Sequence, residues 1–520
     1  MRSAGIILPN SFQGERMMLR RQFLSRSTLA AMAAAWPGPL WATGDPLDGD
    51  LEYVRQAISL HPGALRYLDE EELVRAFAEL KQNWHAAIDL PARYLTLSSF
   101  LSKLRCGHTH CNFYNQSDDV QNALFERTTR LPFFFRWLDG AMIVTRDLTD
   151  TAILKQGTRI ESIDDRRPGE MLAALLQFAN ADGGNDGKRI ALLEVTGGER
   201  FPAFDIFQGM MFPPLRDGRF SIAWTAPDGT AGRGEVRALS PSERLAASPP
   251  PEHNGSPLWT LELSNDGIAV LTMPTWAIYS GGWDWGGWLM EQAPKLYMAR
   301  GLVIDIRGNE GGVSCGNPIL ARLSNTDIPL DAFRNLVRFR RIPDPLNVVM
   351  DTPSPTFRTL GLNLLPVGNG FYGQPADVAP EVIEAATPRL TNPVAVLTDA
   401  ANSSATFLFA HTIKRYGLAR LFGGTTGGNM RGINAGAVGF VRLPASGIEF
   451  DVPLMGYFSQ SVALDRGVEP DVAVPVTAED IAYGRDPVIE AATAWVSQSL
   501  QLRRVATMAQ GDHEATGNDT

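Results

Sequence analysis

Residues 301–312 read GLVIDIRGNEGG, an almost unbroken apolar run that ends in a charged turn and a pair of glycines. Two further apolar runs share this pattern, GIAVLTM at 267–273 and PVAVLT at 393–398. Runs without polar alternation predict strands that are buried on both faces of a parallel sheet. Helical patterns separate the runs, so we expect an α/β domain over residues 255–480.

The run at 393–398 leads into a serine. It ends near Asp399, and the segment that follows predicts a helix beginning near Ser404. A hydroxyl at the carboxyl edge of an open α/β sheet lies where such sheets place their sites. The unpaired N–H groups of a first helical turn can also stabilise an anion. Serine is equally a favoured helix cap, so a purely structural role is the alternative.

The glycine pair offers backbone groups to the same edge of the sheet. Gly311 and Gly312 let the chain approach a ligand closely and present N–H groups. Together with the N–H of Ala405, either glycine is a candidate donor to the oxyanion of an acyl-transfer reaction. A simple turn of the chain is the alternative explanation of the pair.

A serine nucleophile needs a base, and histidine is the usual one. The chain has 7 histidines, and His108 stands in the segment CGHTHC at 106–111. Cysteine and histidine at this alternating spacing would also suit a soft metal such as Zn²⁺, with His110 as a further ligand. Cys106 and Cys111 would alternatively pair as a disulfide in an oxidising compartment. The residues alone leave these three possibilities open.

The regions before the α/β domain differ in pattern. Residues 46–130 carry apolar positions at intervals of three and four, which predicts a small helical N-terminal domain. Residues 131–240 change to strand-like runs. Within them GTRIESIDD at 157–165 predicts a strand entering a turn, and it resembles the core of a PDZ-like module. We therefore expect a β-rich, PDZ-like domain over residues 131–240.

Two further segments connect and end the chain. Residues 240–257 are rich in serine, proline and glutamate, which predicts a linker. Residues 481–520 contain one amphipathic helix, from Pro487 to Leu502. A polar tail follows from Gly511, and we expect it to be disordered.

The first 42 residues predict an export signal. RRQFL at 20–24 precedes the apolar run TLAAMAAAW at 28–36, and the small Ala42 precedes a polar stretch. The paired arginines resemble those of twin-arginine signals. These features predict a periplasmic or secreted protein, and an uncleaved anchor helix is the alternative.

The composition excludes several classes of partner. The net charge of −10 argues against nucleic acid, because phosphate binding needs a basic surface. No apolar stretch of about 20 residues follows residue 45, so we expect no membrane span after removal of the signal. The chain has 3 cysteines, too few for a disulfide framework.

Four segments in order resemble the S41 family of serine peptidases, which includes the tail-specific processing proteases and the tricorn core. They are GLVIDIRGNEGG at 301–312, NPVAVLTDAANSSATFLFAHTIKRYGLARLFGGTTGG at 392–428, RLPASGIEFDVPL at 442–454 and RGVEPDVAVP at 466–475. The likeness covers about residues 95–112 and 260–480. It implies a ClpP/crotonase-like catalytic domain, preceded by the PDZ-like and helical domains.

The resemblance also assigns roles to residues. It places the family's nucleophile at Ser404 and its oxyanion donors at the residues proposed above. Tail-specific members use a Ser–Lys dyad, but Asn429 stands at the lysine position, and Lys414 is too far along the predicted helix to replace it. The tricorn-like subtype takes its base from an N-terminal histidine, and that role falls on His108.

The acid that would orient His108 is less well marked. The family's glutamate falls at or beside Leu464, so Asp465 is the expected residue, with Glu469 and Asp471 as alternatives. Such an acid mainly orients the base and stabilises the imidazolium.

The sequence thus predicts an exported serine endopeptidase that hydrolyses peptide or protein substrates through an acyl-enzyme, without metal or cofactor. A non-catalytic protein that binds peptides or lipophilic ligands is the alternative, because retinoid-binding modules resemble the same fold. An aromatic cluster would line the lipophilic pocket in that case: Trp276, Tyr279, Trp283, Trp285 and Trp288.

Overall fold

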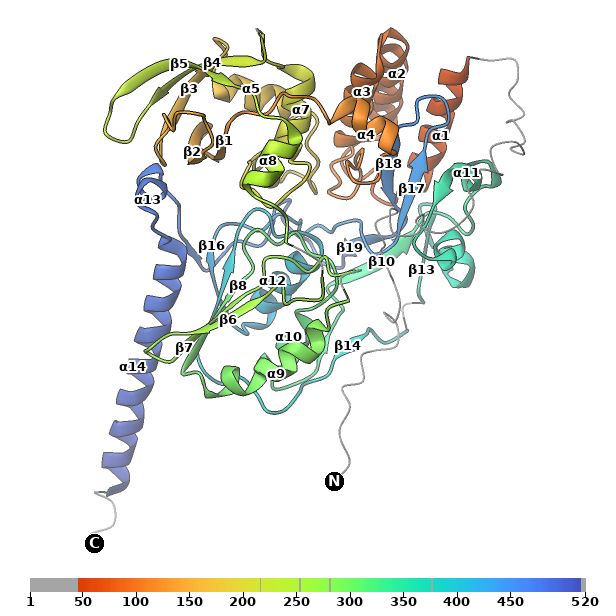
Figure 1. The fold of residues 1–520 in the computed structure, drawn as a ribbon. Helices are drawn as coiled ribbons and strands as arrows, with labels where there is room; N and C mark the ends of the chain where they lie inside the picture. Colours follow the sequence, from red (N-terminus) through yellow and green to blue (C-terminus); the bar gives the residue numbers. More distant parts are fainter. Residues whose placement is uncertain (1–44, 216, 252–253, 280–281, 376, 516–520) are drawn as a thin grey trace.

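The computed structural model describes residues 45–215, 217–251, 254–279, 282–375 and 377–515. The predicted export signal therefore lies outside the described residues. Figure 1 shows two smaller units, one helical and one built on a β-sheet, side by side above a larger α/β unit. None of the helices in the described ranges combines the length and apolar character needed to cross a membrane.

Four helices form the N-terminal unit: α1 (Pro46–Leu60), α2 (Glu70–Ala86), α3 (Leu90–Ser102) and α4 (Asp118–Leu124). Each begins after a polar residue whose side chain accepts an N–H bond from the first turn, which satisfies one unpaired donor. These residues are Asp45, Asp69, Asp89 and Ser117. The segment 106–111 follows α3 without regular structure, so side-chain contacts set its position.

The second unit is an antiparallel sheet in the order β1-β2-β3-β4-β5. Its strands are β1 (Phe133–Leu138), β2 (Ala141–Asp147), β3 (Arg159–Ile163), β4 (Arg219–Thr225) and β5 (Ala231–Arg237). Between β3 and β4 lie α5 (Pro168–Leu175), α6 (Asp186–Leu192) and α7 (Ala203–Met211). The apolar faces of this unit and of the N-terminal helices share one continuous core.

The predicted linker at 240–257 contains a helix instead, α8 (Pro241–Ala247). A capping box between Ser240 and Glu243 starts it. Arg244 on this helix is buried and donates to the carbonyl oxygen of Phe133 at 3.2 Å. Arg244 and the buried Arg130 both face Asp205, so α8 is part of the β-sheet unit.

The α/β unit is built on a six-stranded sheet in the order β20-β16-β15-β8-β7-β6, parallel except for the β6–β7 pair. Its strands are β6 (Thr260–Leu263), β7 (Ile268–Thr272), β8 (Gly301–Asp305), β15 (Val394–Thr398), β16 (Arg420–Gly423) and β20 (Val472–Ala473). The three predicted apolar runs form the neighbouring strands β7, β8 and β15, as expected for a parallel sheet.

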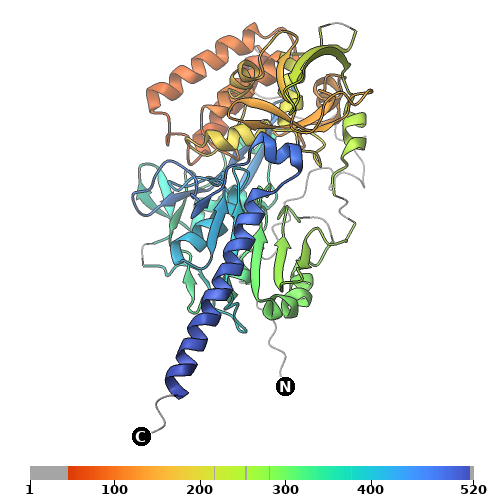
Figure 2. The ribbon, with the colours of Figure 1, turned by 90° about the vertical axis from the view of Figure 1, so that its left-hand side faces the viewer.

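Helices cover both faces of this sheet. Leu302 and Ile304 of β8 share a core with α9 (Trp285–Met298), α10 (Asn317–Leu323) and α12 (Ser404–Tyr416). Val303 points to the opposite face, where α14 (Pro487–Ala515) packs along the sheet (Figure 2). The helix α14 continues to Ala515, beyond the predicted end at Leu502.

Three smaller sheets complete the unit. One has the order β11-β17-β18, and its strands β17 and β18 pack against the N-terminal helices. The others have the orders β12-β13-β10-β19 and β14-β9. The remaining bounds are β9 (Ile328–Pro329), β10 (Phe333–Val337), α11 (Asp344–Val349), β11 (Met350–Asp351), a 3₁₀ helix (Pro355–Asn363), β12 (Leu365–Gly368), β13 (Phe371–Gly373), β14 (Val382–Ile383), β17 (Val438–Arg442), β18 (Glu449–Pro453), β19 (Gly456–Ser459) and α13 (Ala478–Tyr483).

Candidate active site

Ser404 lies at the turn between β15 and α12. Its φ is +50°, a left-handed conformation that is uncommon for a residue with a side chain. Such strain persists where surrounding contacts hold it, and it often occurs at functional sites. The cap of α12 is Ser403, not Ser404. Ser404 therefore does not occupy the cap position, and the Ser403 side chain there makes no capping hydrogen bond.

Three side chains bind this turn to the loop after β8. Asn402 Nδ2 donates to the carbonyl oxygen of Asn309 at 3.1 Å. Thr406 Oγ1 donates to the same oxygen at 2.8 Å. Ser403 Oγ donates to the carbonyl oxygen of Glu310 at 3.1 Å. The serine turn and the glycine loop are consequently one connected structure.

The glycine pair packs directly against this turn and against the segment after β7. Gly311 has φ +99° and Gly312 has φ +135°. A Cβ at Gly311 would lie 2.9 Å from both Ser404 Cβ and Ala405 N, and a Cβ at Gly312 would lie 2.1 Å from Trp276 O. Both positions therefore exclude a side chain, which a simple surface turn would not require.

The backbone N–H groups beside Ser404 differ in whether they already have a hydrogen-bond acceptor. In the described ranges, the N–H groups of Ala405 and Gly312 have no hydrogen-bond acceptor. The N–H of Gly311 already donates to Asn309 Oδ1 at 2.9 Å. The sequence left open which glycine supplies the second oxyanion donor. In this structure Gly312 has the available N–H, whereas Gly311 supplies the space beside it.

His108 lies in the irregular segment after α3, which is held from two sides. His61 Nε2 and Thr109 Oγ1 form a buried hydrogen bond of 2.8 Å. The N–H of Asp451, on β18, donates to the carbonyl oxygen of His110 at 2.9 Å. The N-terminal helices and the strand β18 of the α/β unit thus jointly position the segment that carries His108.

Charged groups from three elements surround the His108 ring. Burial is the largest influence and lowers the pKa of His108; Asp182 and Glu310 oppose that effect, and Lys188 adds to it. A lowered pKa leaves the imidazole neutral at pH 7, the state that a general base requires. No hydrogen bond joins His108 to Ser404 among the described residues. Glu310 connects the two regions. Its carboxylate interacts with His108, and its carbonyl oxygen accepts a hydrogen bond from Ser403 Oγ, next to Ser404.

Asp465, the expected orienting acid, has other partners. It accepts hydrogen bonds from Tyr67 Oη at 2.9 Å, from Asn429 Nδ2 at 2.7 Å and from the N–H of Gly184 at 3.2 Å. In the described part of the chain no hydrogen bond joins it to His108. The two alternatives are also engaged elsewhere. Glu469 pairs with Arg466 at 2.6 Å, and Asp471 pairs with Lys414.

Asp182, which the sequence did not single out, is one of two carboxylates near His108 and raises its pKa more than Glu310 does. It is only 2% exposed. Its Oδ1 accepts the N–H of Gly107 at 3.0 Å, while its buried Oδ2 has no partner in the described structure. Asn429, at the position of the absent dyad lysine, donates to the backbone oxygen of Asp182 at 3.3 Å. Asp182 lies in a polar loop with no local pattern that marks it.

Lys188 is a second residue that sequence reasoning missed. It lies on α6, is 6% exposed, and forms an ion pair with Glu310. Its Nζ also donates to the carbonyl oxygen of Ala401 at 3.2 Å. Lys188 therefore links the glycine loop to the segment that leads into Ser404, from a unit separate in the fold.

The metal and disulfide alternatives for segment 106–111 find no support in the described residues. Cys106 and Cys111 are both buried and free. No group of three or more histidine, cysteine or acidic side chains in the described ranges is arranged to hold a metal ion. Burial raises the pKa of Cys106 to about 11 and that of Cys111 to about 12, so both remain thiols at neutral pH.

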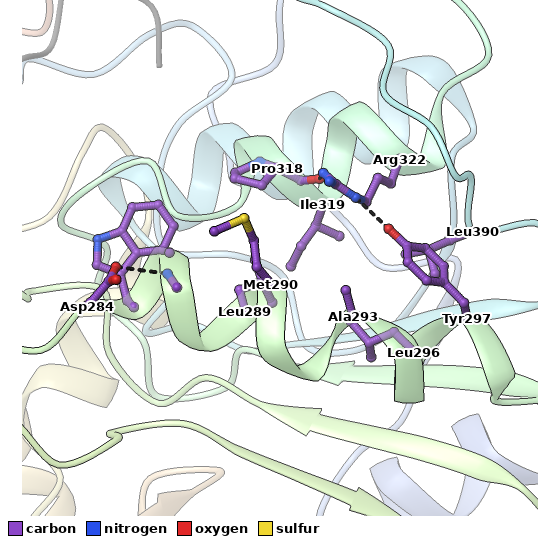
Figure 3. Close-up of a pocket in the computed structure, with 13 residues that line it drawn as sticks. Asp284, Leu289, Met290, Ala293, Leu296, Tyr297, Pro318, Ile319, Arg322 and Leu390 are labelled. Atoms are coloured by element: carbon purple, nitrogen blue, oxygen red, sulfur yellow. Dashed lines mark hydrogen bonds between the residues drawn. The ribbon is translucent and has the colours of Figure 1, made fainter. Parts of the chain in front are cut away.

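The aromatic cluster packs mainly on itself. Trp283, Trp285 and Trp288 contact the buried Trp259, and Trp276 packs against Phe409. An apolar pocket of about 290 Å³ lies between α9 and α10 (Figure 3). Of the five aromatic residues named from the sequence, only Trp285 lines it. Arg322 Nε, also in the lining, donates to Tyr297 Oη at 2.7 Å.

A serine held in a strained strand-to-helix turn, beside a backbone that presents free N–H groups, suits acyl transfer through a covalent intermediate. Residues 267–474 match the model of Peptidase family S41, which includes Ser404 and the glycine pair but not His108 or Asp182. The match spans most of the α/β unit and covers less than half of the chain.

Two solved structures of CPAF share the fold over most of the chain. Mature CPAF in complex with lactacystin has 16% identity and a TM-score of 0.57, covering 88% of this chain and 97% of that one. Mature CPAF alone has 16% identity and a TM-score of 0.56 with the same coverage. The tricorn protease has 13% identity, a TM-score of 0.34, and coverage of 88% and 37%. No curated protein matches the sequence.

Proposed function

We propose that the chain is an exported serine endopeptidase of the Ser–His subtype, with Ser404 as nucleophile and His108 as general base. One observation carries the proposal. Ser404 has a strained φ of +50° and lies against Gly311, next to the free N–H of Ala405. A serine that only capped a helix would need neither the strain nor the glycine.

The chemistry proceeds in two halves. Ser404 Oγ attacks the peptide carbonyl carbon while its proton passes to His108 Nε2. The tetrahedral oxyanion accepts hydrogen bonds from the N–H groups of Ala405 and Gly312. The C–N bond then breaks, and the imidazolium returns the proton to the leaving amine. Water attacks the resulting ester with His108 again as base, which releases the acid and restores Ser404.

The two assigned residues are tested by substitution. Ser404→Ala should abolish covalent labelling by a fluorophosphonate probe, and His108→Ala should reduce both labelling and peptide hydrolysis by about 10³-fold or more. Ser403→Ala is the matched control, because it removes the neighbouring hydroxyl. It should still be labelled at Ser404, as peptide mass spectrometry would show. Labelling that persists in Ser404→Ala would refute the nucleophile assignment.

The β-sheet unit is proposed to hold part of the substrate, as a PDZ-like module would. Among the described strands β5 pairs only with β4, and its residues alternate between exposed and half-buried as far as Glu235, before the buried Val236. An edge of this kind can accept an extended peptide by strand addition. A proline at Glu235, in the middle of β5, should weaken binding of a peptide substrate and raise KM. An unchanged KM would exclude this edge as the peptide site.

The proposal that the protein is exported is supported by the paired arginines of the N-terminal segment. Substitution of Arg20 and Arg21 by lysine should leave the protein in the cytoplasmic fraction, since twin-arginine signals depend on these residues. The non-catalytic alternative predicts a different result: an apolar ligand that binds with no hydrolysis and no fluorophosphonate labelling of the wild-type chain.

A further inference from the structure

We infer that Asp182 is the positioning residue of His108: its Oδ2 accepts the Nδ1–H of the imidazole when the site is engaged, and so directs Nε2 towards Ser404. This inference rests on the proposed function. It gives Asp182 the role for which the sequence suggested Asp465.

Two unsatisfied polar atoms lie in the same buried region. His108 Nδ1 and Asp182 Oδ2 are both buried without a hydrogen-bond partner in the described structure. An unpaired buried carboxylate oxygen is costly, so native proteins rarely leave one without a purpose. A hydrogen bond between the two would satisfy both atoms, and catalytic hydrogen bonds are often long before substrate binds.

The backbone around Asp182 is built to hold its carboxylate beside the histidine. Gly107, which precedes His108, donates its N–H to Asp182 Oδ1 at 3.0 Å. Asn180 Nδ2 donates to the carbonyl oxygen of the same glycine. A Cβ at position 107 would lie 2.9 Å from Asp182 Oδ2, so the carboxylate occupies the space of a side chain there. The glycine therefore makes room for the acid.

The charges agree with this pairing. Asp182 is the first of the charged groups that oppose the lowering of the His108 pKa, followed by Glu310, with Lys188 acting in the opposite sense. In return, burial raises the pKa of Asp182 and His108 is the largest influence that lowers it. His110 and Cys106 are further titratable neighbours. Burial lowers the pKa of His110 to about 4 and raises that of Cys106 to about 11, so both are neutral at pH 7.

The hydrogen bonds of Asp182 do not indicate a purely structural role. Asp465 binds Tyr67, Gly184 and Asn429, and it is an acceptor for all three. Asp182 has one side-chain hydrogen bond, to the peptide that precedes the base. A carboxylate that only fixed the loop would not need its second oxygen buried next to an unpaired imidazole nitrogen.

The test is the pH dependence of fluorophosphonate labelling in Asp182→Asn. An asparagine keeps the bond from Gly107 but presents an amide donor to His108, which favours the wrong tautomer. We expect labelling to slow by about 10²- to 10⁴-fold at pH 7.5. The midpoint of the pH profile should also move to lower pH, because the charge that raised the His108 pKa is gone.

Asp186→Asn is the matched control, since it makes the same change four residues away, at an exposed residue that begins α6 and pairs with Arg189. It should leave both rate and midpoint unaltered. Asp465→Asn decides between the two acids: if it, and not Asp182→Asn, displaces the midpoint, the inference is overturned. A slower Asp182→Asn with an unmoved midpoint overturns it too, because a merely structural defect lowers the rate equally at every pH.

A second measurement uses the wild type in case Asp182→Asn does not fold. Nitrogen-15 NMR of the phosphonylated enzyme should find the His108 proton on Nδ1; a proton on Nε2 alone would contradict the pairing. Wild-type enzyme that is not labelled at Ser404 refutes the proposed function itself, and the positioning role with it. Labelled wild type with an equally reactive Asp182→Asn refutes only the role of Asp182.

Discussion

Replacement of Gly311 by alanine places a methyl group in the space where the oxyanion would bind. The added Cβ would lie 2.7 Å from Ser403 O and 2.9 Å from both Ala405 N and Ser404 Cβ. Ordinary contacts between heavy atoms begin near 3.5 Å, so about 0.6 Å or more of overlap must be relieved. An oxyanion accepts from such a donor at about 2.7–3.1 Å, and the methyl would occupy that same position.

The expected loss follows from this geometry. Blocking one donor costs about 10²- to 10³-fold in kcat, which corresponds to roughly 2.7–4 kcal/mol of transition-state stabilisation. The backbone adds a cost to folding of about 1–2 kcal/mol, because φ +99° is unfavourable for alanine. We expect Gly311→Ala to remain folded with a lower Tm, and to lose fluorophosphonate labelling and peptide hydrolysis in parallel.

Gly308 offers the matched control in the same loop. It also has a positive φ, +75°, but a Cβ there would meet nothing within 4 Å. Gly308→Ala therefore carries the backbone cost alone, and its N–H can still donate to Asp399 Oδ2. Labelling normalised to folded protein should stay near the wild-type rate in Gly308→Ala. If Gly311→Ala is labelled as fast as Gly308→Ala, Gly311 does not border the oxyanion site.

Three further perturbations test other parts of the structure. Lys188→Met should lower kcat about tenfold with little change in KM, because the ion pair that holds Glu310 of the glycine loop is lost. Adding Glu310→Gln to Lys188→Met should cause no further loss of kcat, because both changes remove the same ion pair. Additive losses in the double variant would show that the two residues do not act together. Asp205→Ala should cost about 3–5 kcal/mol in chemical denaturation, since it leaves two buried arginines unpaired; a loss below about 1 kcal/mol would refute this. His61 and His110 have pKa values lowered to about 3 and about 4, so they stay neutral in the folded chain while the unfolded chain takes up protons below about pH 6.5. Stability should therefore fall as pH drops from about 6.5 to 4, by up to about 1.4 kcal/mol per pH unit for each group, and His110→Gln should make the Tm–pH curve less steep.

The local arrangement of the α/β unit follows from the chain itself. Leu302 and Ile304 face one side of the sheet and Val303 the other, and an apolar residue at each successive position is what both faces require. The turn at Ser404 and the glycine pair could be found in the same way. Each of these features depends on residues close together along one strand and its following loop.

The helix α8 and the tail of α14 mark where local patterns failed. Proline and serine at 240–241 read as linker, although Ser240 and Glu243 form a capping box that starts a helix. Arg244 then packs on β1, more than 100 residues away, with a contact to Phe133. The helix α14 likewise extends to Ala515, past the end at Leu502 that the apolar pattern predicted.

Taken by itself, the amino-acid sequence determined the strand runs, the helix that begins at Ser404 and the glycines that must lie beside it. Such features arise from backbone conformation and the pattern of burial over a few residues. Only the tertiary structure decided which charged groups surround His108, because Asp182 and Lys188 come from loops and helices of another unit. Contacts across 75 residues, from Gly107 to Asp182, and 122 residues, from Lys188 to Glu310, leave no periodic trace in the chain. They form because a buried carboxylate or ammonium group must find a partner wherever the packed core brings one near.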